Sequence, residues 1–239
     1  MEQLIRSGMN DCAIARATGI PRGTIREWRW GLEGRPRYQK RGPAVPQSCP
    51  ICDGARLDAA AYAYLLGLYL GDGWLSEHRR RVYRLRVALD MRYPAIIDEC
   101  AQAMATVSRR RVGRQMARGC VQVCSYWKHW PCVFPQHASG QKHLRPIELA
   151  PWQAEIASAH PELLLRGLIH SDGSRTLNRV NGTIYPRYEF TNFSEGIRRI
   201  FCRACDRYGV SWTQPKWRAI SIARRRDVAR LDVVIGPKK

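Results

Sequence analysis

The sequence predicts an α+β fold of two αββαββα halves related by a pseudo-twofold axis, with a small helical module in front of them. Three observations lead to this prediction. A nine-residue stretch recurs 100 positions later, the same order of strands and helices follows each copy, and residues 1–33 have a helical pattern of their own. With 239 residues, 45% of them hydrophobic, the chain is long enough to bury the core that such a fold needs.

The charge of the chain points to a polyanionic partner. Forty Lys and Arg residues against twenty Asp and Glu give a formal net charge of +20, and such a positive field concentrates polyanions at the surface. Double-stranded DNA is the first partner to consider. An anionic membrane is not expected, because the sequence lacks a run of about 18 apolar residues and a long helix with basic and apolar faces.

The beginning of the chain bears on its compartment. The segment MEQLIRSGMN lacks the apolar core of a signal peptide. We therefore expect a cytoplasmic, nucleoid-associated protein whose nine cysteines stay reduced rather than forming disulfides.

Residues 1–33 are expected to form short helices, because apolar residues recur at helical spacing and are interrupted at Gly8 and Gly19. Ala15, Gly19 and Ile25 have the spacing of a helix-turn-helix: a small residue at the helix contact, a glycine for the left-handed turn and a branched residue that seats the second helix. Pro21 suits the first turn of that helix. The residues then available to DNA are Arg22, Thr24, Arg26 and Arg29. A helical hairpin used only for packing is the alternative.

Residues 34–60 are rich in Pro, Gly and cations and have no periodicity, so they are predicted to be a linker. Within the linker, Cys49 and Cys52 form a CPIC knuckle of the kind that holds structural Zn²⁺, but one such pair is half of a tetrahedral site. A loose second set exists at Cys132, His137 and His143. Another CxxC pair, Cys202 and Cys205, lies in a helical pattern where a core role is favoured. Buried or loop thiols without metal remain the alternative.

The repeat marks a third region, residues 61–236, with halves at about 61–150 and 151–236. The first copy, Leu65 to Gly73, reads LLGLYLGDG, and the second, Leu165 to Gly173, reads LRGLIHSDG. Glycine and a terminal aspartate oppose the stability of an isolated helix. Their recurrence therefore indicates a shared structural or chemical requirement.

The sequence that follows each copy repeats as well. An alternating strand is predicted at Arg84–Asp90 and again at Arg187–Phe193. A helix follows each strand, with apolar stripes at Ile97, Cys100, Ala101 and Met104 in the first copy and at Ile197, Ile200, Phe201 and Ala204 in the second. A second strand pair contains Cys120–Cys124 in one copy and Ala219–Ala223 in the other.

The two motif helices are expected to pack against each other. Gly67 and Gly71 share one helical face, as do Gly167 and Ser171, so the two backbones can approach closely there. The leucines and isoleucine around them face the two cores: Leu65, Leu68, Leu165, Leu168 and Ile169. If the helices run in the same sense, Asp72 and Asp172 meet at one end. Two carboxylates beside two helix C-termini form a negative spot that favours a divalent cation.

These motifs resemble those of the LAGLIDADG homing endonucleases in their single-chain, two-motif form, over about residues 61–236. The resemblance implies two β-sheets that form a saddle over the DNA major groove and motif aspartates, here Asp72 and Asp172, that hold Mg²⁺. It implies further that the carbonyls of Gly71 and Ser171 assist, and that a basic residue, Lys128 or Lys216, lies near the scissile phosphate. The motifs depart from the family pattern at Leu70, Gly71, Arg166 and His170.

Sequence readout is expected from the polar faces of the strands, and the candidate residues are Arg84, Arg86, Arg187, Glu189, Thr191 and Asn192. A generic basic sheet that contacts only phosphates is the alternative. The predicted function is sequence-specific hydrolysis of DNA phosphodiesters by a monomer, since both halves are on one chain. Two alternatives stay open on the same scaffold: a DNA-binding transcriptional regulator that does not cleave, and an RNA-splicing maturase.

Overall fold

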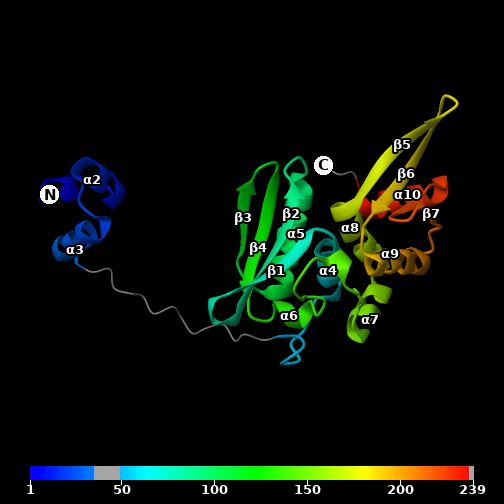
Figure 1. Ribbon diagram of the computed structural model, residues 1–239, viewed down its shortest axis with the longest axis horizontal. Helices are drawn as coiled ribbons and strands as arrows, with labels where there is room; N and C mark the ends of the chain where they lie inside the picture. The colour runs from blue at the N-terminus through cyan, green and yellow to red at the C-terminus, as the bar shows by residue number, and fades with distance from the viewer. Residues whose placement is uncertain (35–48, 237–239) are drawn as a thin grey trace. The chain divides into compact units, whose positions relative to one another are not determined.

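The computed structural model describes residues 1–34 and 49–236, and the chain divides into two units, Met1–Gln47 and Ser48–Lys239 (Figure 1). Most of the predicted linker, residues 35–48, lies outside the described residues. Among the helices of the described residues, none combines the length and the apolar character that crossing a membrane requires.

The N-terminal unit contains three helices, and their bounds are α1 Glu2–Arg6, α2 Asp11–Thr18 and α3 Arg22–Glu33. Ile5, Ile14 and Ile25, at most 2% exposed, form its core. Gly19 ends α2 in the left-handed region, with φ 72°, so the predicted turn forms where glycine is needed. Trp28 is 44% exposed on α3.

The second unit contains the predicted repeat of elements. Its first half consists of α4 Ala59–Asp72, β1 Gly73–His78, η1 Arg79–Arg81, β2 Val82–Asp90, α5 Pro94–Ser108, β3 Val112–Ala117, β4 Cys120–Trp127 and α6 Trp130–Val133. The connection carries η2 Lys142–Leu144 and α7 Pro151–Ala159. The second half consists of α8 Pro161–Asp172, β5 Gly173–Val180, β6 Thr183–Thr191, α9 Glu195–Tyr208, β7 Thr213–Lys216, β8 Ala219–Ile222 and α10 Arg225–Ile235.

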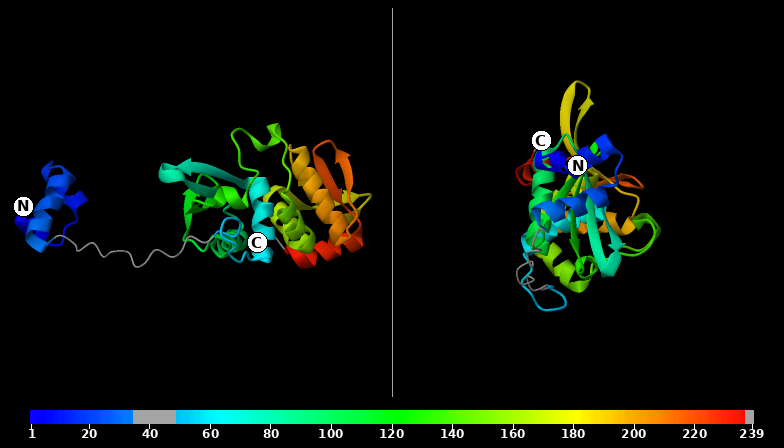
Figure 2. Two further views of the ribbon diagram at one scale, coloured as in Figure 1. Left: turned by 90° about the horizontal axis from the view of Figure 1, so that it is seen from below. Right: turned by 90° about the vertical axis from the view of Figure 1, so that its left-hand side faces the viewer.

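Each half builds one four-stranded antiparallel sheet, with strand order β1-β2-β4-β3 in the first and β5-β6-β8-β7 in the second. The identical order confirms the internal duplication predicted from the sequence. The helices α4 and α8 lie between the two sheets (Figure 1). The hairpin of β5 and β6 projects beyond its half (Figures 1 and 2), because β8 pairs only with Tyr188–Thr191 and leaves the outer part of β6 to β5 alone.

The core of the second unit is continuous through both halves. On β2 the alternate residues Leu85, Val87 and Leu89 are at most 3% exposed and face the helices. The predicted stripes on α5 and α9 are buried too, with Ala101 partly buried. Because every strand alternates its side chains, burying this face leaves the opposite face of each sheet for polar residues.

One predicted strand differs in its bounds. The expectation for the second half was Arg187–Phe193, whereas β6 ends at Thr191. The Asn192 side chain accepts the N–H of Ser194 at 2.7 Å, which turns the chain toward the start of α9. At its other end β6 begins earlier, at Thr183, since Asn181 and Gly182 take positive φ values of 49° and 79° and close a two-residue hairpin.

Candidate metal centre and nucleic-acid interface

The two motif helices pack with their backbones in close approach. A Cβ added to Gly67 would lie 2.6 Å from the carbonyl oxygen of Leu164 and 2.7 Å from the amide nitrogen of Leu168. A Cβ on Gly167 would meet the carbonyl oxygen of Tyr64. Only glycine leaves room for this contact, which is why both copies of the motif keep it at the same place.

The helices run in the same sense, so their carboxyl ends lie together. Asp72 is the last residue of α4 and Asp172 is the last residue of α8. A Cβ on Gly71 would run into the side chain of Ser171 and lie 3.0 Å from Oδ2 of Asp172. The negative ends of two helix dipoles and two carboxylates therefore share a small volume, and this arrangement attracts a cation.

The glycine that follows each aspartate has a steric role. Gly73 and Gly173 have extended backbone, with φ −91° and −103°. A Cβ at either position would lie 2.6 Å from the Cα atom of Tyr69 or of Ile169, one turn back in its own helix. The Asp-Gly pair thus lets each strand leave its helix directly beneath the carboxylate.

Asn192 lies beside this centre instead of in the row of DNA-reading residues where the sequence placed it. Its Nδ2 donates to Oδ2 of Asp172 at 2.6 Å. The Ser171 hydroxyl turns back and donates to the carbonyl oxygens of Gly167 and Leu168, at 3.1 and 3.0 Å. Asn192 therefore orients one candidate metal ligand.

A lysine that sequence reasoning missed completes the centre. Nζ of Lys142, in the connection between the halves, donates to the carbonyl oxygens of Leu70 and Gly71 at 3.0 Å each and also to that of Tyr69. Burial lowers the pKa of Lys142 to about 8, although Asp172 and Asp72 act in the opposite direction. With forty cations in the sequence, no local pattern distinguished this one.

The two predicted basic candidates lie elsewhere. Gly73, next to Asp72, is in register through β2 with Val123. Lys128 comes five residues after Val123, about 16 Å along the strand direction, and it is exposed. Lys216 lies on the edge strand β7 and is exposed. Of the three lysines, Lys142 is the one whose Nζ contacts the end of α4.

Arg166 and His170, the two residues of α8 that depart from the family motif, form contacts with neighbouring elements. Arg166 forms a two-pronged pair with Glu99 of α5 at 2.7 and 2.8 Å and donates to the carbonyl oxygen of Ile235 at 2.7 Å. The buried ring of His170 lies with Nδ1 2.9 Å from the Tyr64 hydroxyl. Both side chains tie α8 to its neighbours and do not alter the aspartate at its end.

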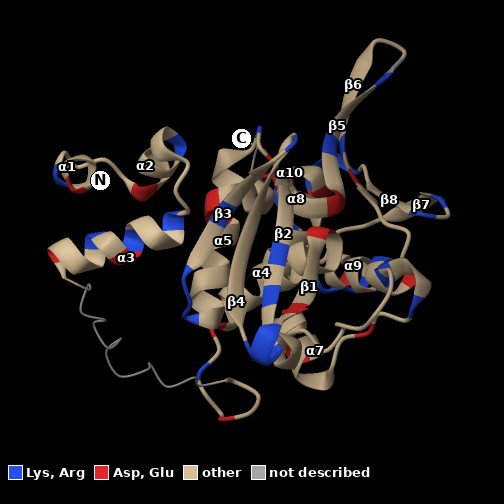
Figure 3. Ribbon diagram, turned by 60° about the vertical axis from the view of Figure 1, so that its left-hand side comes forward, with Lys and Arg blue, Asp and Glu red and all other residues tan. Residues whose placement is uncertain are grey.

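The outer faces of both sheets carry the predicted polar residues. Arg84 and Arg86 alternate with the buried residues of β2, and blue bands follow this strand in Figure 3. Arg86 lies over the ring of Trp74 at 4.3 Å, and burial together with Arg84 lowers its pKa. On β6, Arg187 and Glu189 point to the same face, with N and O atoms 3.8 Å apart.

Two further features favour an anionic ligand on these faces. The Nε atoms of Arg84, Arg86 and Arg187 are buried and have no hydrogen-bond partner among the described residues. The connection between β1 and β2, Arg79–Arg81, exposes three consecutive arginines that sequence reasoning did not single out. Buried donors beside exposed cations suit phosphate and base oxygens.

In the N-terminal unit the candidate DNA residues divide into two groups. Arg22 and Arg26 are exposed on α3 and Thr24 is partly exposed. Arg29 is held internally, since its guanidinium donates to Asp11 at 2.9 Å, to Glu33 at 3.1 Å and to the carbonyl oxygen of Met9 at 2.6 Å. Arg29 therefore joins α3 to α2 instead of projecting into solvent.

The predicted zinc residues are partly brought together. Cys49 and Cys52 lie with Cys132, one member of the second loose set, and with His129, which the sequence reasoning did not consider. The histidines of that set lie beside aromatic rings, His137 by Tyr83 and His143 by Phe193. Cys202 and Cys205 belong to α9, where Cys205 is buried in the core as expected.

Comparison with solved structures identifies the fold. The homing endonuclease I-DmoI in complex with DNA and Mn is 14% identical, with a TM-score of 0.51 over 75% of this chain and 98% of that one. I-WcaI, a homing endonuclease bound to its DNA recognition sequence, is 13% identical, with a TM-score of 0.51 over 81% and 90%. The N-terminal LAGLIDADG domain of DUF199/WhiA is 15% identical, with a TM-score of 0.49 over 82% and 86%.

No protein-family model matches the sequence, and no curated protein matches it. At 13–14% sequence identity, the similarity to I-DmoI and I-WcaI shows the fold of the chain. The second unit has the two-domain LAGLIDADG fold, as the repeated motif predicts.

Proposed function

We propose that the protein is a sequence-specific DNA endonuclease that hydrolyses phosphodiester bonds with the help of a divalent metal. The observation that carries the proposal is the close packing of α4 and α8, which supports a site shared by Asp72 and Asp172. Two carboxylates beside two helix C-termini form an acidic site in a chain of net charge +20. Two of the structural neighbours, I-DmoI and I-WcaI, are homing endonucleases bound to DNA.

The donor set fits a hard cation. Asp72 and Asp172 would hold Mg²⁺ or Mn²⁺, and the carbonyls of Gly71 and Ser171 are the additional candidate ligands, since these ions prefer oxygen. When bound, such an ion supplies activation of water and neutralisation of charge on the phosphate. I-DmoI was crystallised with DNA and Mn, which is in keeping with this assignment.

The residues around the carboxylates have distinct proposed roles. Asn192 holds the Asp172 carboxylate in one orientation through its 2.6 Å hydrogen bond. Lys142 supplies a positive charge next to both aspartates, where it can neutralise a phosphate oxygen. Hydrogen bonds hold both side chains in place. Lys142 donates to the carbonyl oxygens of Leu70 and Gly71, and Asn192 bonds to the Asp172 carboxylate and to the Ser194 N–H.

Recognition of double-stranded DNA is assigned to the two sheet faces and to the N-terminal unit. Arg84, Arg86, Arg187 and Glu189 would read bases or contact phosphates, and Arg22, Thr24 and Arg26 of α3 would add a second contact region. The proposed active form is a monomer, since one chain contains both halves of the centre. A stable dimer in sedimentation experiments would contradict this.

One contact favours a second candidate, a DNA-binding regulator that does not cleave. The carbonyl of Gly71, a candidate metal ligand, accepts a hydrogen bond from Lys142 at 3.0 Å. A metal that used this oxygen would have to displace the ammonium group. If Lys142 holds its position permanently, the scaffold binds DNA without hydrolysing it.

The test is cleavage of a randomised plasmid library in Mg²⁺ by the full chain. We expect nicking or cutting at selected sites, and its loss by at least about 100-fold in Asp72→Asn and Asp172→Asn. Asp98→Asn is the matched control, because Asp98 is an exposed carboxylate on α5 that pairs with Arg114. DNA binding that no metal affects, without cleavage, would support the regulator instead, and stimulated intron excision would support a maturase.

A further inference from the structure

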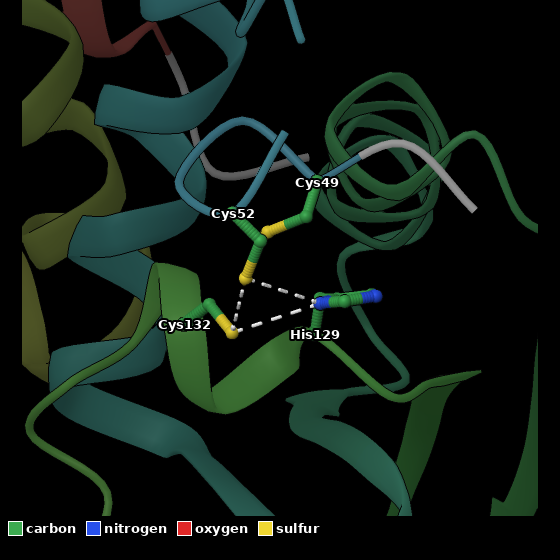
Figure 4. A group of neighbouring side chains, drawn as sticks. All are labelled: Cys49, Cys52, His129 and Cys132. Carbon is green, nitrogen blue, oxygen red and sulfur yellow. Dashed lines mark hydrogen bonds between the residues drawn. The ribbon is translucent and has the colours of Figure 1, made fainter. Parts of the chain in front are cut away.

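Four side chains with metal-binding atoms lie together beside the first half, and they come from two segments that are far apart in sequence (Figure 4). Cys49 and Cys52 come from the loop before α4, and His129 and Cys132 come from the junction of β4 with α6. The sulfur of Cys52 is 3.6 Å from Nδ1 of His129 and 3.6 Å from the sulfur of Cys132. The sulfur of Cys132 is 3.7 Å from the same nitrogen.

These separations match a tetrahedral ion. With Zn–S bonds of about 2.3 Å and Zn–N bonds of about 2.05 Å, two sulfurs around one zinc are about 3.8 Å apart, and a sulfur and a nitrogen are about 3.6 Å apart. A disulfide would need about 2.05 Å between sulfurs, and Cys49, Cys52 and Cys132 are all free. We propose that Cys49, Cys52, His129 and Cys132 bind one structural zinc ion.

The loop that carries Cys49 is closed by two hydrogen bonds between Cys49 and Asp53. The Cys49 carbonyl accepts the N–H of Asp53 at 2.9 Å. The Asp53 carboxylate in turn accepts the Cys49 N–H at 2.7 Å. These two hydrogen bonds close the loop from Cys49 to Asp53 and fix the backbone that carries the first cysteine of the CPIC pair.

The composition of the cluster selects the metal and its role. Three thiolates and one imidazole are soft ligands that suit zinc and do not suit magnesium. Four protein ligands also fill the tetrahedron, so no position remains for a reacting water. The ion would therefore be structural, separate from the oxygen ligands at Asp72 and Asp172.

The position of the cluster indicates what zinc would hold. Cys52 is 77 residues from His129 and 80 from Cys132, so the ion closes a long loop and removes conformations from the unfolded chain. All four ligand atoms lie within 4.8 Å of one another, and Cys49 is fully buried whereas Cys52 is exposed. Zinc would thus anchor the chain that leads into α4 onto the end of the first sheet.

The first test measures metal content on the purified full chain. We expect one zinc ion per chain by elemental mass spectrometry, falling below about a tenth of an ion in Cys52→Ser and His129→Asn. Cys202→Ser and His137→Asn are the matched controls, since they remove the same ligand types outside the cluster. Both controls are expected to keep the ion.

The second test does not depend on whether the variants fold. Replacement of the metal by Co²⁺ in the unmodified chain is expected to give the visible absorption of a tetrahedral ion and a thiolate charge-transfer band. Chelation is expected to lower the Tm of the unmodified chain. An absence of bound metal, retention of zinc by the Cys52 variant, or a Cys52–Cys132 disulfide in unreduced protein would overturn the proposal. None of these outcomes depends on DNA cleavage.

Discussion

The contact between α4 and α8 can be probed by the smallest change that disturbs it, Gly67→Ala. The added Cβ would lie 2.6 Å from the carbonyl oxygen of Leu164, whereas ordinary contact begins at 3.4 Å. The helices must therefore separate by roughly 0.8 Å. Both neighbouring atoms belong to the backbone, so no side chain can rotate away to absorb the change.

The expected loss of stability follows from two opposing effects. Overpacking a well-filled contact costs about 1–3 kcal/mol, and a clash with backbone atoms belongs in the upper part of that range, about 2–3 kcal/mol. Alanine in place of glycine inside a helix returns about 1 kcal/mol. The net effect is a loss of about 1–2 kcal/mol, which lowers the Tm of a unit of this size by roughly 2–8 °C. Cleavage should fall by about 10- to 100-fold, since the aspartates at the helix ends move by a comparable distance.

The assay is thermal unfolding followed by circular dichroism, together with the rate of plasmid nicking. Gly113→Ala is the control from the same unit, because a Cβ there would meet the sulfur of Cys124 at 3.7 Å, an ordinary contact. Its Tm is expected to match the parent or to rise slightly. A Gly67→Ala protein at least as stable as the parent would refute the close packing on which the proposed centre depends.

Three other changes test separate contacts. Lys142→Met removes the positive charge beside both aspartates, so Ca²⁺ should bind several-fold more tightly in calorimetry; weaker binding would contradict the assigned position. Asn192→Ala should lower cleavage about 10-fold at unchanged DNA affinity, because a hydrogen bond to a charged group is worth about 1.5–3 kcal/mol; a parallel loss of affinity would return Asn192 to the DNA-contacting residues. The hydrogen bond from Arg175 lowers the pKa of Asp232 in the folded protein. The pair therefore stabilises the fold fully at pH values above the unfolded carboxyl pKa of about 4. This stabilisation is lost as the pH falls through the lower folded pKa. In urea titrations Asp232→Asn should accordingly be less stable at neutral pH, with a difference that shrinks in acid, and a constant difference would argue against the pair.

Much of the fold could be predicted because the chain repeats itself. Glycine on one face of a helix indicates close contact with another backbone. Because this helix occurs twice and the same order of strands follows each copy, the sequence indicated that the two halves pair through these helices. The buried stripes of α5 and α9 followed from their spacing alone. These features are local patterns of residue type, which a sequence displays directly.

The residues that the sequence did not reveal are those defined by distant partners. Lys142 is one cation among forty until the fold brings it to the end of α4. His129 was overlooked in favour of His137 and His143, although it stands three residues before Cys132, the same spacing that separates Cys49 from Cys52. The sequence suggested that Asn192 and Arg29 face the DNA, but Asn192 donates a hydrogen bond to Asp172 and Arg29 donates one to Asp11.

The two sheet faces are copies in architecture but not in chemistry. In the first, two arginines project from the central strand, whereas in the second an arginine stands next to a glutamate. Identical subunits would present the same side chains twice and so favour a palindrome. Fusion of the halves into one polypeptide frees each face to diverge, and a duplex that both faces contact would therefore have unlike left and right arms.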